Sequence, residues 1–490
     1  MSAIHNSKYI KLIKTFTKEE SKSFGLWLNS PWSNSNKNLI SLFEKIKKYY
    51  PDFNSPKLTK ERLFKQILPN GKYSDRRMNN LLSEGYLVAE KFVIFQNLNR
   101  DQNLQKELLV KEFQNRHLED WFFKESNSEI EKLESKEVKG WEDHLYLFQL
   151  HRQVYHHPNQ SLRMKPANQT LEKMSEPIDL AYLLEKAAII NEKIFRNRLI
   201  KGENYDITLD LMNWLTLSKN VENLSIKLYK MRFDYTEENM LDQYFQLREF
   251  FLKRFKELNE REQKIHLGSL INDTIKLIRG RSFEITELLP LYKVGLEFDL
   301  LLKDGILTER RFVAVVAASN TKKDFIFSNE LIEKYTNKLE PKIQKDGLFW
   351  AKAHTEYYKE NLDKCLDILL NHNFKIQYFQ QATRILTTEV YFDLYLINDS
   401  YHSYLFNYFD SFEKWILREK FKSKILKVSY LRFVQLTRIL AKSISDKNYK
   451  IEKIENLLKN EPNIQASEWL NKKIKRVIKI KKRRPSNYSR

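Results

Sequence analysis

The sequence predicts an all-α protein, in which a small N-terminal helical domain is followed by an array of helix hairpins. The chain of 490 residues contains only ten glycines and eleven prolines, whereas folds rich in tight turns need more of both. Between residues 176 and 461 the only prolines are Pro177, Pro290 and Pro341. Long stretches without such breakers, rich in Leu, Lys, Glu and Ile, favour helices.

The length predicts several structural units, because 490 residues exceed what one compact core accommodates. A content of 42% hydrophobic and 13% aromatic residues supports packed interiors and excludes global disorder. The expected order is an N-terminal helical domain at 1–100, a helical connector at 101–155, a loop or linker at 156–177, a helical-repeat array at 178–480 and a basic disordered tail at 481–490.

Clear start and stop signals divide the N-terminal hundred residues into short helices. Thr17 and Glu20 have the spacing of a capping box. The helix that follows them ends at Ser30, because Pro31 disfavours helical geometry in the residue before it. Farther on, the segment "HHPNQSLRMKPANQTLEKMSEP" at 156–177 contains three prolines, and it is the predicted linker.

From residue 178 onward, apolar residues recur at helical spacing, and aromatic or small residues recur at Phe312, Trp350 and Ala382. Two of the expected helices are 325–335 and 412–441, and the last one, at 463–478, packs through Leu470, Ile474 and Val477. The order of residue types in "FWAKAHTEYYKENLDKCLDILL" is similar to a tetratricopeptide hairpin. We therefore expect an α-solenoid, and an irregular helical bundle is the alternative.

Three segments carry a second resemblance. "FTKEESKSFGLWLNSPWSNSNKNLISLFEKIKKYYPDF" and "LTKERLFKQILPNGKYSDRRMNNLLSE" resemble the N-terminal region of an uncharacterised family of all-helical bacterial proteins. "IDLAYLLEKAAIINEKIFRN", near residue 180, resembles the central helix of that family. The resemblance implies a helical fold and implies no activity, cofactor or catalytic residue.

The sequence contains none of the catalytic motifs that mark common enzyme classes. Neither a phosphate-binding glycine loop nor a nucleophile elbow nor an H-E-x-x-H helix occurs, so we expect a protein that is not an enzyme and has no cofactor. His144, His151, His156 and His157 lack the spacing of zinc ligands on a helix, and we expect them to be exposed or capping.

The single cysteine, Cys365, excludes an internal disulfide and is expected to be buried and inert. It also suits a reducing compartment. With no signal peptide and no apolar run long enough to span a bilayer, the expected location is the cytoplasm, without a membrane partner.

Two functions remain open. The first is a scaffold or adaptor that binds a protein or peptide partner through the array, because aromatic residues dominate interface energies. The candidate contacts are Trp350, Tyr357, Tyr358, Tyr378 and Phe379.

The second function is association with nucleic acid or the ribosome. The net charge of +21 favours an anionic partner, although a lysine-rich helical surface also accounts for it. A helix-turn-helix-like pair at 59–95, with "EGYLVAEKFVIFQN" as a possible β-wing, adds to the basic tail. The candidate contacts are Lys481, Lys482, Arg483, Arg484, Arg76 and Arg77.

Overall fold

The computed structural model describes residues 4–158, 170–200, 202–235, 240–280, 282–421, 423–445 and 464–483. Helices make up the regular structure of these ranges, which also contain an isolated β-bridge between Lys303 and Ile306. The all-α prediction is therefore confirmed. The chain divides into two compact units: residues 1–136 with 146–177, and residues 137–145 with 178–490.

Among the described residues, the first unit begins with six α-helices. They are α1 (Lys8–Ile13), α2 (Lys18–Asn29), α3 (Lys37–Ile46), α4 (Lys60–Ile67), α5 (Asp75–Arg100) and α6 (Gln102–Asn115), with the 3-10 turn η1 (Lys47–Tyr49) after α3. The helix α7 (Glu119–Glu134) and residues 146–155 of α8 (Trp141–Tyr155) follow.

Helix α5 packs against α1, α2, α3 and α4 and closes the N-terminal core. The ring of Phe24 lies at the centre, 5.0 Å from the ring of Phe43 and 5.3 Å from that of Phe92 between centroids. The capping box at the start of α2 is confirmed: Thr17 Oγ1 accepts from the amide of Glu20, and the Glu20 carboxylate accepts from the amide of Thr17.

The second unit begins with residues 137–145 and, from residue 178, with α9 (Thr170–Leu199). Its other elements up to residue 300 are α10 (Thr208–Ser218), α11 (Leu224–Phe233), α12 (Met240–Arg254), η3 (Phe255–Glu257), α13 (Glu260–Arg279), η4 (Ile285–Leu288) and α14 (Leu289–Glu297). The later elements are α15 (Glu309–Thr321), α16 (Phe325–Tyr335), η5 (Thr336–Lys338), α17 (Gln344–Tyr358), α18 (Leu362–Asn371), α19 (Gln377–Ile397), η6 (Asp399–Tyr401), α20 (His402–Arg418), α21 (Lys424–Ser445) and α23 (Ser467–Arg483).

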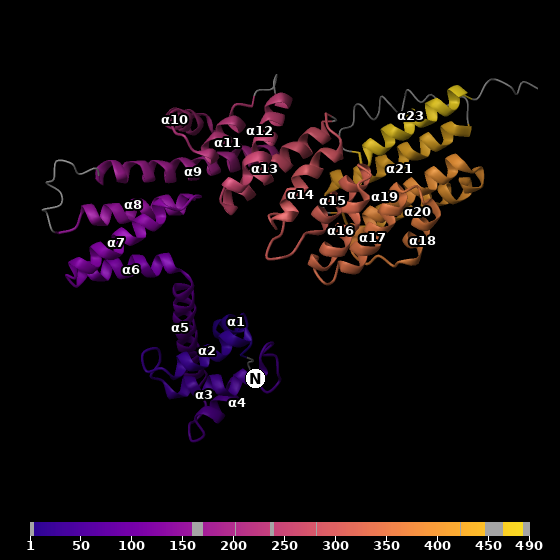
Figure 1. Cartoon of the computed structure of the whole chain (residues 1–490). Helices are drawn as coiled ribbons and strands as arrows, with labels where there is room; N and C mark the ends of the chain where they lie inside the picture. Colours follow the sequence, from indigo (N-terminus) through magenta and orange to yellow (C-terminus); the bar gives the residue numbers. More distant parts are fainter. Residues whose placement is uncertain are drawn as a thin grey trace, which may run out of the picture. The chain divides into compact units, whose positions relative to one another are not determined.

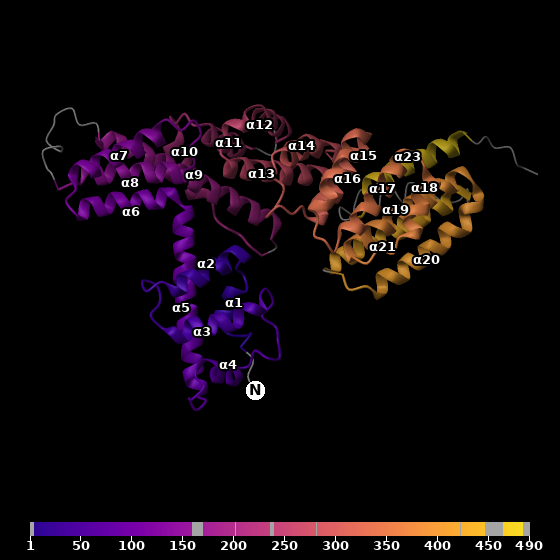
Figure 2. The same cartoon turned by 60° about the horizontal axis from the view of Figure 1, so that its bottom comes forward.

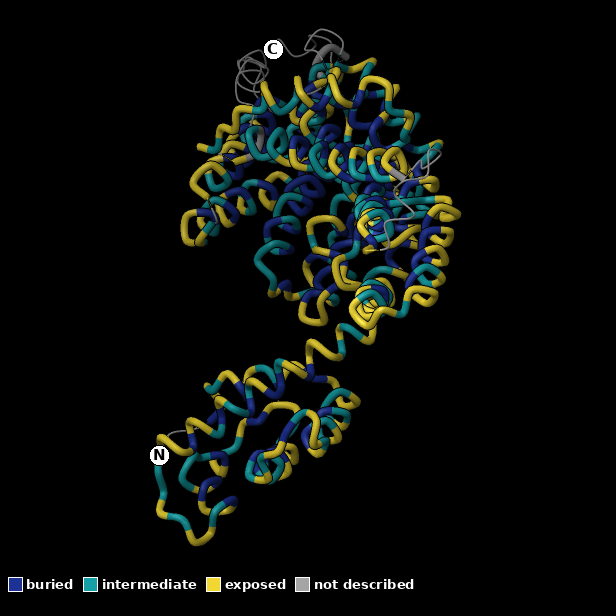
Figure 3. The backbone as a smooth tube through the Cα atoms, turned by 90° about the vertical axis from the view of Figure 1, so that its left-hand side faces the viewer, coloured by how far each residue is buried: buried dark blue, intermediate teal, exposed yellow. Residues whose placement is uncertain are grey.

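From α15 onward, helices that follow one another pack together, and the alternate helices α15 and α17, and α17 and α19, do so as well. Helix α17 contacts its sequence neighbours α16 and α18 and also α15 and α19, as Figure 1 and Figure 2 show. Helix α21 packs against both α20 and α23. Most helices alternate between buried and exposed positions (Figure 3), as amphipathic helices do.

Helix α19 departs from that pattern, because every residue from Leu386 to Tyr395 is buried. A helix that is covered on all its faces lies inside a helical layer. Its two acidic residues in this stretch, Glu389 and Asp393, are therefore enclosed with it.

Two expectations about local structure are wrong. The suggested β-wing at 84–97 is part of α5, since Val88, Ala89 and Phe92 recur at helical spacing on its buried face. The single helix expected at 412–441 is two helices, α20 and α21. The chain breaks after Arg418, and the Ser423 hydroxyl starts α21 by accepting from the amide of Leu426.

The structure describes only part of the predicted linker at 156–177. Residues 159–169 lie outside the described residues, and residues 170–177 belong to α9. Pro177 lies inside this helix.

Candidate functional site

The strongest candidate site is a cavity of about 580 Å³ to which α15, α17, α19 and α21 all contribute side chains. Trp350 and His354 lie one turn apart on α17, so both face the same side of that helix. From α19 the spacing of three and four residues brings Tyr378, Gln381 and Glu389 to one wall. Tyr430 of α21 and the α15 residues Glu309 and Arg310 also line the cavity.

Glu389 is the most unusual group in this cavity. It is only 8% exposed, and burial raises the pKa of its carboxyl from 4.5 to about 8. Lys473 opposes this rise and Asp393 adds to it. No side chain in the described ranges donates a hydrogen bond to the Glu389 carboxyl or forms an ion pair with it within 4.0 Å. A carboxyl left without a partner in a protein interior is costly.

His354 contributes a neutral ring to the cavity, because burial lowers its pKa from 6.5 to about 3. Its tautomer follows from Asn320. The Thr355 hydroxyl donates to the carbonyl of Ala351 at 2.9 Å, so it accepts from Asn320 Nδ2 at 3.1 Å. The same Nδ2 group donates to His354 Nδ1 at 3.0 Å, which leaves the imidazole proton on Nε2. His354 Nε2 is therefore a hydrogen-bond donor in the cavity wall.

Glu389 also lines a second cavity, of about 480 Å³, between α17, α19 and α23. There a chain of hydrogen bonds ties the three helices together. Trp469 Nε1 donates to the Tyr357 hydroxyl at 2.8 Å, and that hydroxyl donates to Asp393 Oδ2 at 2.7 Å. Lys473 Nζ lies 2.6 Å from the same Oδ2. Asp393 is thus fully paired, in contrast to Glu389 one turn earlier.

The five aromatic residues that were expected to contact a partner do not share one site in the structure. Trp350 and Tyr378 line the first cavity, and Tyr357 and Tyr358 line the second. Phe379 is 0% exposed within the core. Phe379 lines neither cavity.

The predicted basic contacts lie in two places. Arg76 and Arg77 are exposed in the first turn of α5, while Met78 beside them is buried. Helix α23 extends to Arg483, farther than the expected end near residue 478, so the backbone of Lys481, Lys482 and Arg483 is helical. Arg484 lies outside the described residues.

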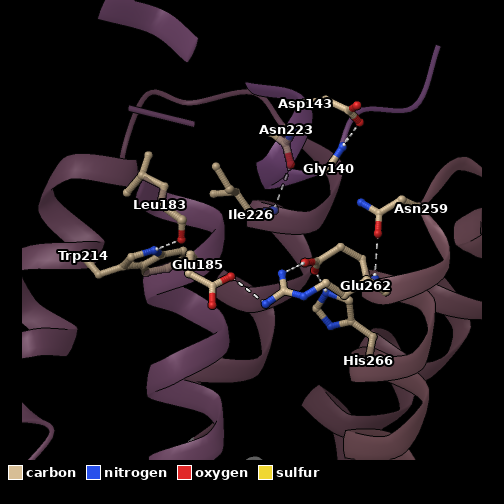
Figure 4. Close-up of polar contacts among 11 residues, drawn as sticks. Gly140, Asp143, Leu183, Glu185, Trp214, Asn223, Ile226, Asn259, Glu262 and His266 are labelled. Carbon is tan, nitrogen blue, oxygen red and sulfur yellow. Dashed lines mark hydrogen bonds and ion pairs between the residues drawn. The ribbon is translucent and has the colours of Figure 1, made fainter. Parts of the chain in front are cut away.

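A third polar cluster, shown in Figure 4, joins α9 to α13. The Arg261 guanidinium lies 2.5 Å from a Glu185 oxygen and 3.6 Å from a Glu262 oxygen. Glu262 in turn lies 3.4 Å from His266 Nε2, and both side chains are almost completely buried. Trp214 Nε1 donates to the carbonyl of Leu183 at 2.8 Å and so connects α10 to α9. We interpret this cluster as a structural connection between α9 and α13, because the buried carboxylate of Glu262 has the Arg261 guanidinium beside it.

The histidines expected to be exposed or capping are mostly buried. His144, His151 and His157 are less than 9% exposed, and His156 alone is exposed. Burial lowers the pKa of His144 and of His151. Among the described residues, no group of three or more His, Cys, Asp or Glu side chains has the arrangement of a metal site. The predicted burial of Cys365 is confirmed, and burial raises the pKa of its thiol to about 12.

Sequence reasoning did not identify Glu389, Gln381 or His354 as site residues. The available signal was the run "LTTEVYFDLYL", whose apolar residues fall on all sides of a helix. Such a pattern indicates a buried helix and therefore buried acids.

No described helix is both long enough and apolar enough to cross a membrane. The all-helical architecture agrees with the family resemblance noted in the sequence, and membership in that family stays a prediction. Comparisons with protein-family models, with curated proteins and with solved structures found no match.

Proposed function

We propose that the helices from α15 to α23 form a solenoid-like array that binds a protein or peptide partner in the cavity lined by α15, α17, α19 and α21. The protein would act as a scaffold or adaptor and would not catalyse a reaction. One observation supports the proposal above others: alternate helices contribute in turn to one cavity, as the inner helices of repeat arrays do.

The chemistry of the walls agrees with this proposal. The rings of Trp350, Tyr378 and Tyr430 supply large apolar faces, and the amide of Gln381 supplies a donor and an acceptor. An apolar pocket with a few converging polar groups is the usual form of a binding site. A single cysteine, buried and reduced, leads us to propose the cytoplasm as its location.

The test is a selection of random-sequence peptides on the full-length protein. The substitution Ala382→Trp places an indole in the cavity, since Ala382 lines it. The control Ile326→Trp adds an indole on α16 at a position that is 85% exposed. We expect selected peptides to lose binding to A382W and to keep binding to I326W. Peptides that bind A382W as well as wild type would contradict the proposal.

Association with nucleic acid is the second candidate, favoured by the exposed Arg76 and Arg77 and by the exposed face of α23, which includes Lys475 and Lys479. Binding through such cations weakens steeply with salt. We would compare RNA and DNA binding of wild type with R76A/R77A and with a variant in which residues 481–484 are alanine. These substitutions are preferable to deletion of α23, whose buried Leu470 belongs to the core. Absence of salt-sensitive binding by wild type would exclude this candidate.

A further inference from the structure

We infer that the occupant of the first cavity is a partner segment that inserts a lysine or arginine side chain, with its cationic group against Glu389. This inference rests on the proposed function and adds the chemical class of the ligand. It follows from three features of the cavity: an acid without a counterion, an aromatic and apolar wall around that acid, and the arrangement of charge at the cavity.

The first feature is the contrast between two acids on α19. Asp393 already has Lys473 and the Tyr357 hydroxyl as partners. Glu389 is more than nine-tenths buried and has no hydrogen bond or ion pair within the described part of the chain. Because Lys473 is held by Asp393, it is not free to pair with Glu389.

The second feature is the wall around the acid. The cavity is lined by the rings of Trp350, Tyr378 and Tyr430, whose faces attract cations. Ile385 and Leu386 of α19 also line it. Lysine and arginine combine a cationic end with an apolar stem, so one such side chain satisfies both the carboxyl and the apolar wall.

The third feature is the arrangement of charge at the cavity. Arg310 lines the cavity from α15 but is exposed, and it forms no ion pair with Glu389. Glu309 beside it adds a second carboxylate. His354 adds no positive charge, because burial keeps its ring neutral. Among the described residues, none therefore brings a positive charge to the interior of the cavity, and Glu389 is an acid that can receive one.

Binding of a cation should release a proton. Glu389 is protonated in the free protein at neutral pH, and a cation beside it stabilises the ionised form, so the proton leaves for solvent. The titratable or charged groups around Glu389 are His354, Tyr357 and Tyr358 on α17, Cys365 on α18, Asp393 on α19, Tyr430 on α21, Lys473 on α23, and Glu309 and Arg310 on α15. Of these groups, Lys473 already forms an ion pair with Asp393.

The experiment uses peptides of random sequence selected on the full-length protein at about pH 8, where up to half of Glu389 is ionised. Each selected peptide is then synthesised again with its lysine or arginine replaced by norleucine, which keeps the apolar stem. Affinities are measured by calorimetry for wild type, for E389Q and for the control E333Q, at an exposed position of α16 that does not line the cavity.

We expect the selected peptides to share a basic residue, and we expect norleucine or E389Q to weaken binding about tenfold or more, with E333Q changing it about twofold at most. Wild-type affinity should rise about tenfold or more from about pH 6 to about pH 8, with release of a proton, and this rise should vanish in E389Q.

Failure of this inference and failure of the proposed function would give different results. Peptides that bind wild type and fail on A382W, yet tolerate norleucine and E389Q, would overturn the inference and leave the proposed function standing. Failure to select any peptide that depends on the cavity would overturn the proposed function and, with it, the inference.

Discussion

The substitution Glu389→Gln should stabilise the second unit, and the gain should grow with pH. Gln has nearly the same shape as Glu and carries no charge at any pH. The folded protein raises the pKa of the Glu389 carboxyl from 4.5 to about 8. The folded state therefore binds this proton more tightly than the unfolded state does. The resulting stabilisation is complete below pH 4.5 and is lost as pH rises through about 8.

The size of the effect follows from the same change in pKa. At about 1.4 kcal/mol for each pH unit, the full loss is about 5 kcal/mol. Between about pH 5 and about pH 8, wild type should lose about 3 to 4 kcal/mol that E389Q keeps. Comparing the two proteins at each pH cancels the effects of every other titrating group, provided those groups keep their environment.

The assay is urea unfolding of both proteins at several pH values, together with hydrogen exchange of the amides of α19, which reports on the second unit directly. The matched control is Glu333→Gln on α16, where Glu333 is exposed. The control should follow wild type across the pH range. If E389Q follows wild type to within about 0.5 kcal/mol at both ends of that range, the assignment of Glu389 as a buried acid without a counterion is incorrect.

Three further predictions concern packing, a buried ion pair and the cysteine. A methyl group at Gly295 of α14 would lie 2.6 Å from Leu301 Cγ, so G295A should destabilise the protein by about 1–3 kcal/mol in urea unfolding. G268A in α13, where the methyl group meets open space, should stabilise it by up to about 1 kcal/mol, and equal effects of the two substitutions would contradict the packing. Arg232 NH1 lies 2.7 Å from Asp273 Oδ2 with both side chains buried, so R232M should cost about 3–5 kcal/mol by removing the cation of a buried ion pair, and a loss below about 1 kcal/mol would argue against the pair. Cys365 should resist thiol reagents until the protein unfolds, because it is buried and its pKa is raised to about 12; rapid labelling of the folded chain would refute this.

Local patterns predicted many of the helices well. Helix α16 spans Phe325–Tyr335, as expected from its residues, and the capping box of α2 forms at the two positions that the spacing indicated. Both depend on interactions within a few residues, which sequence spacing reports directly. The break between α20 and α21 was missed because the hydroxyl of a single residue, Ser423, starts the second helix within a polar stretch.

The candidate site was harder to predict, because it depends on which helices meet. The aromatic residues at 350 and 378 were identified, and the structure brings Trp350 and Tyr378 into one cavity. Their periodicity did not show that Phe379 is enclosed or that Glu389 lies without a counterion. Both properties arise from contacts between residues far apart in the chain, and one sequence contains no record of those contacts.

The hydrogen bonds between α17, α19 and α23 have a consequence for how this part of the chain unfolds. In a linear array of helix pairs each pair contacts its neighbours, so the last helix can fray while the rest stays folded. Here the Trp469 indole bonds to the hydroxyl of Tyr357, 112 residues earlier, and Lys473 bonds to Asp393, 80 residues earlier. Opening of α23 therefore removes partners from two inner helices at once. These hydrogen bonds from α23 to α17 and α19 should make the helices unfold as one cooperative unit, whose amides should exchange together.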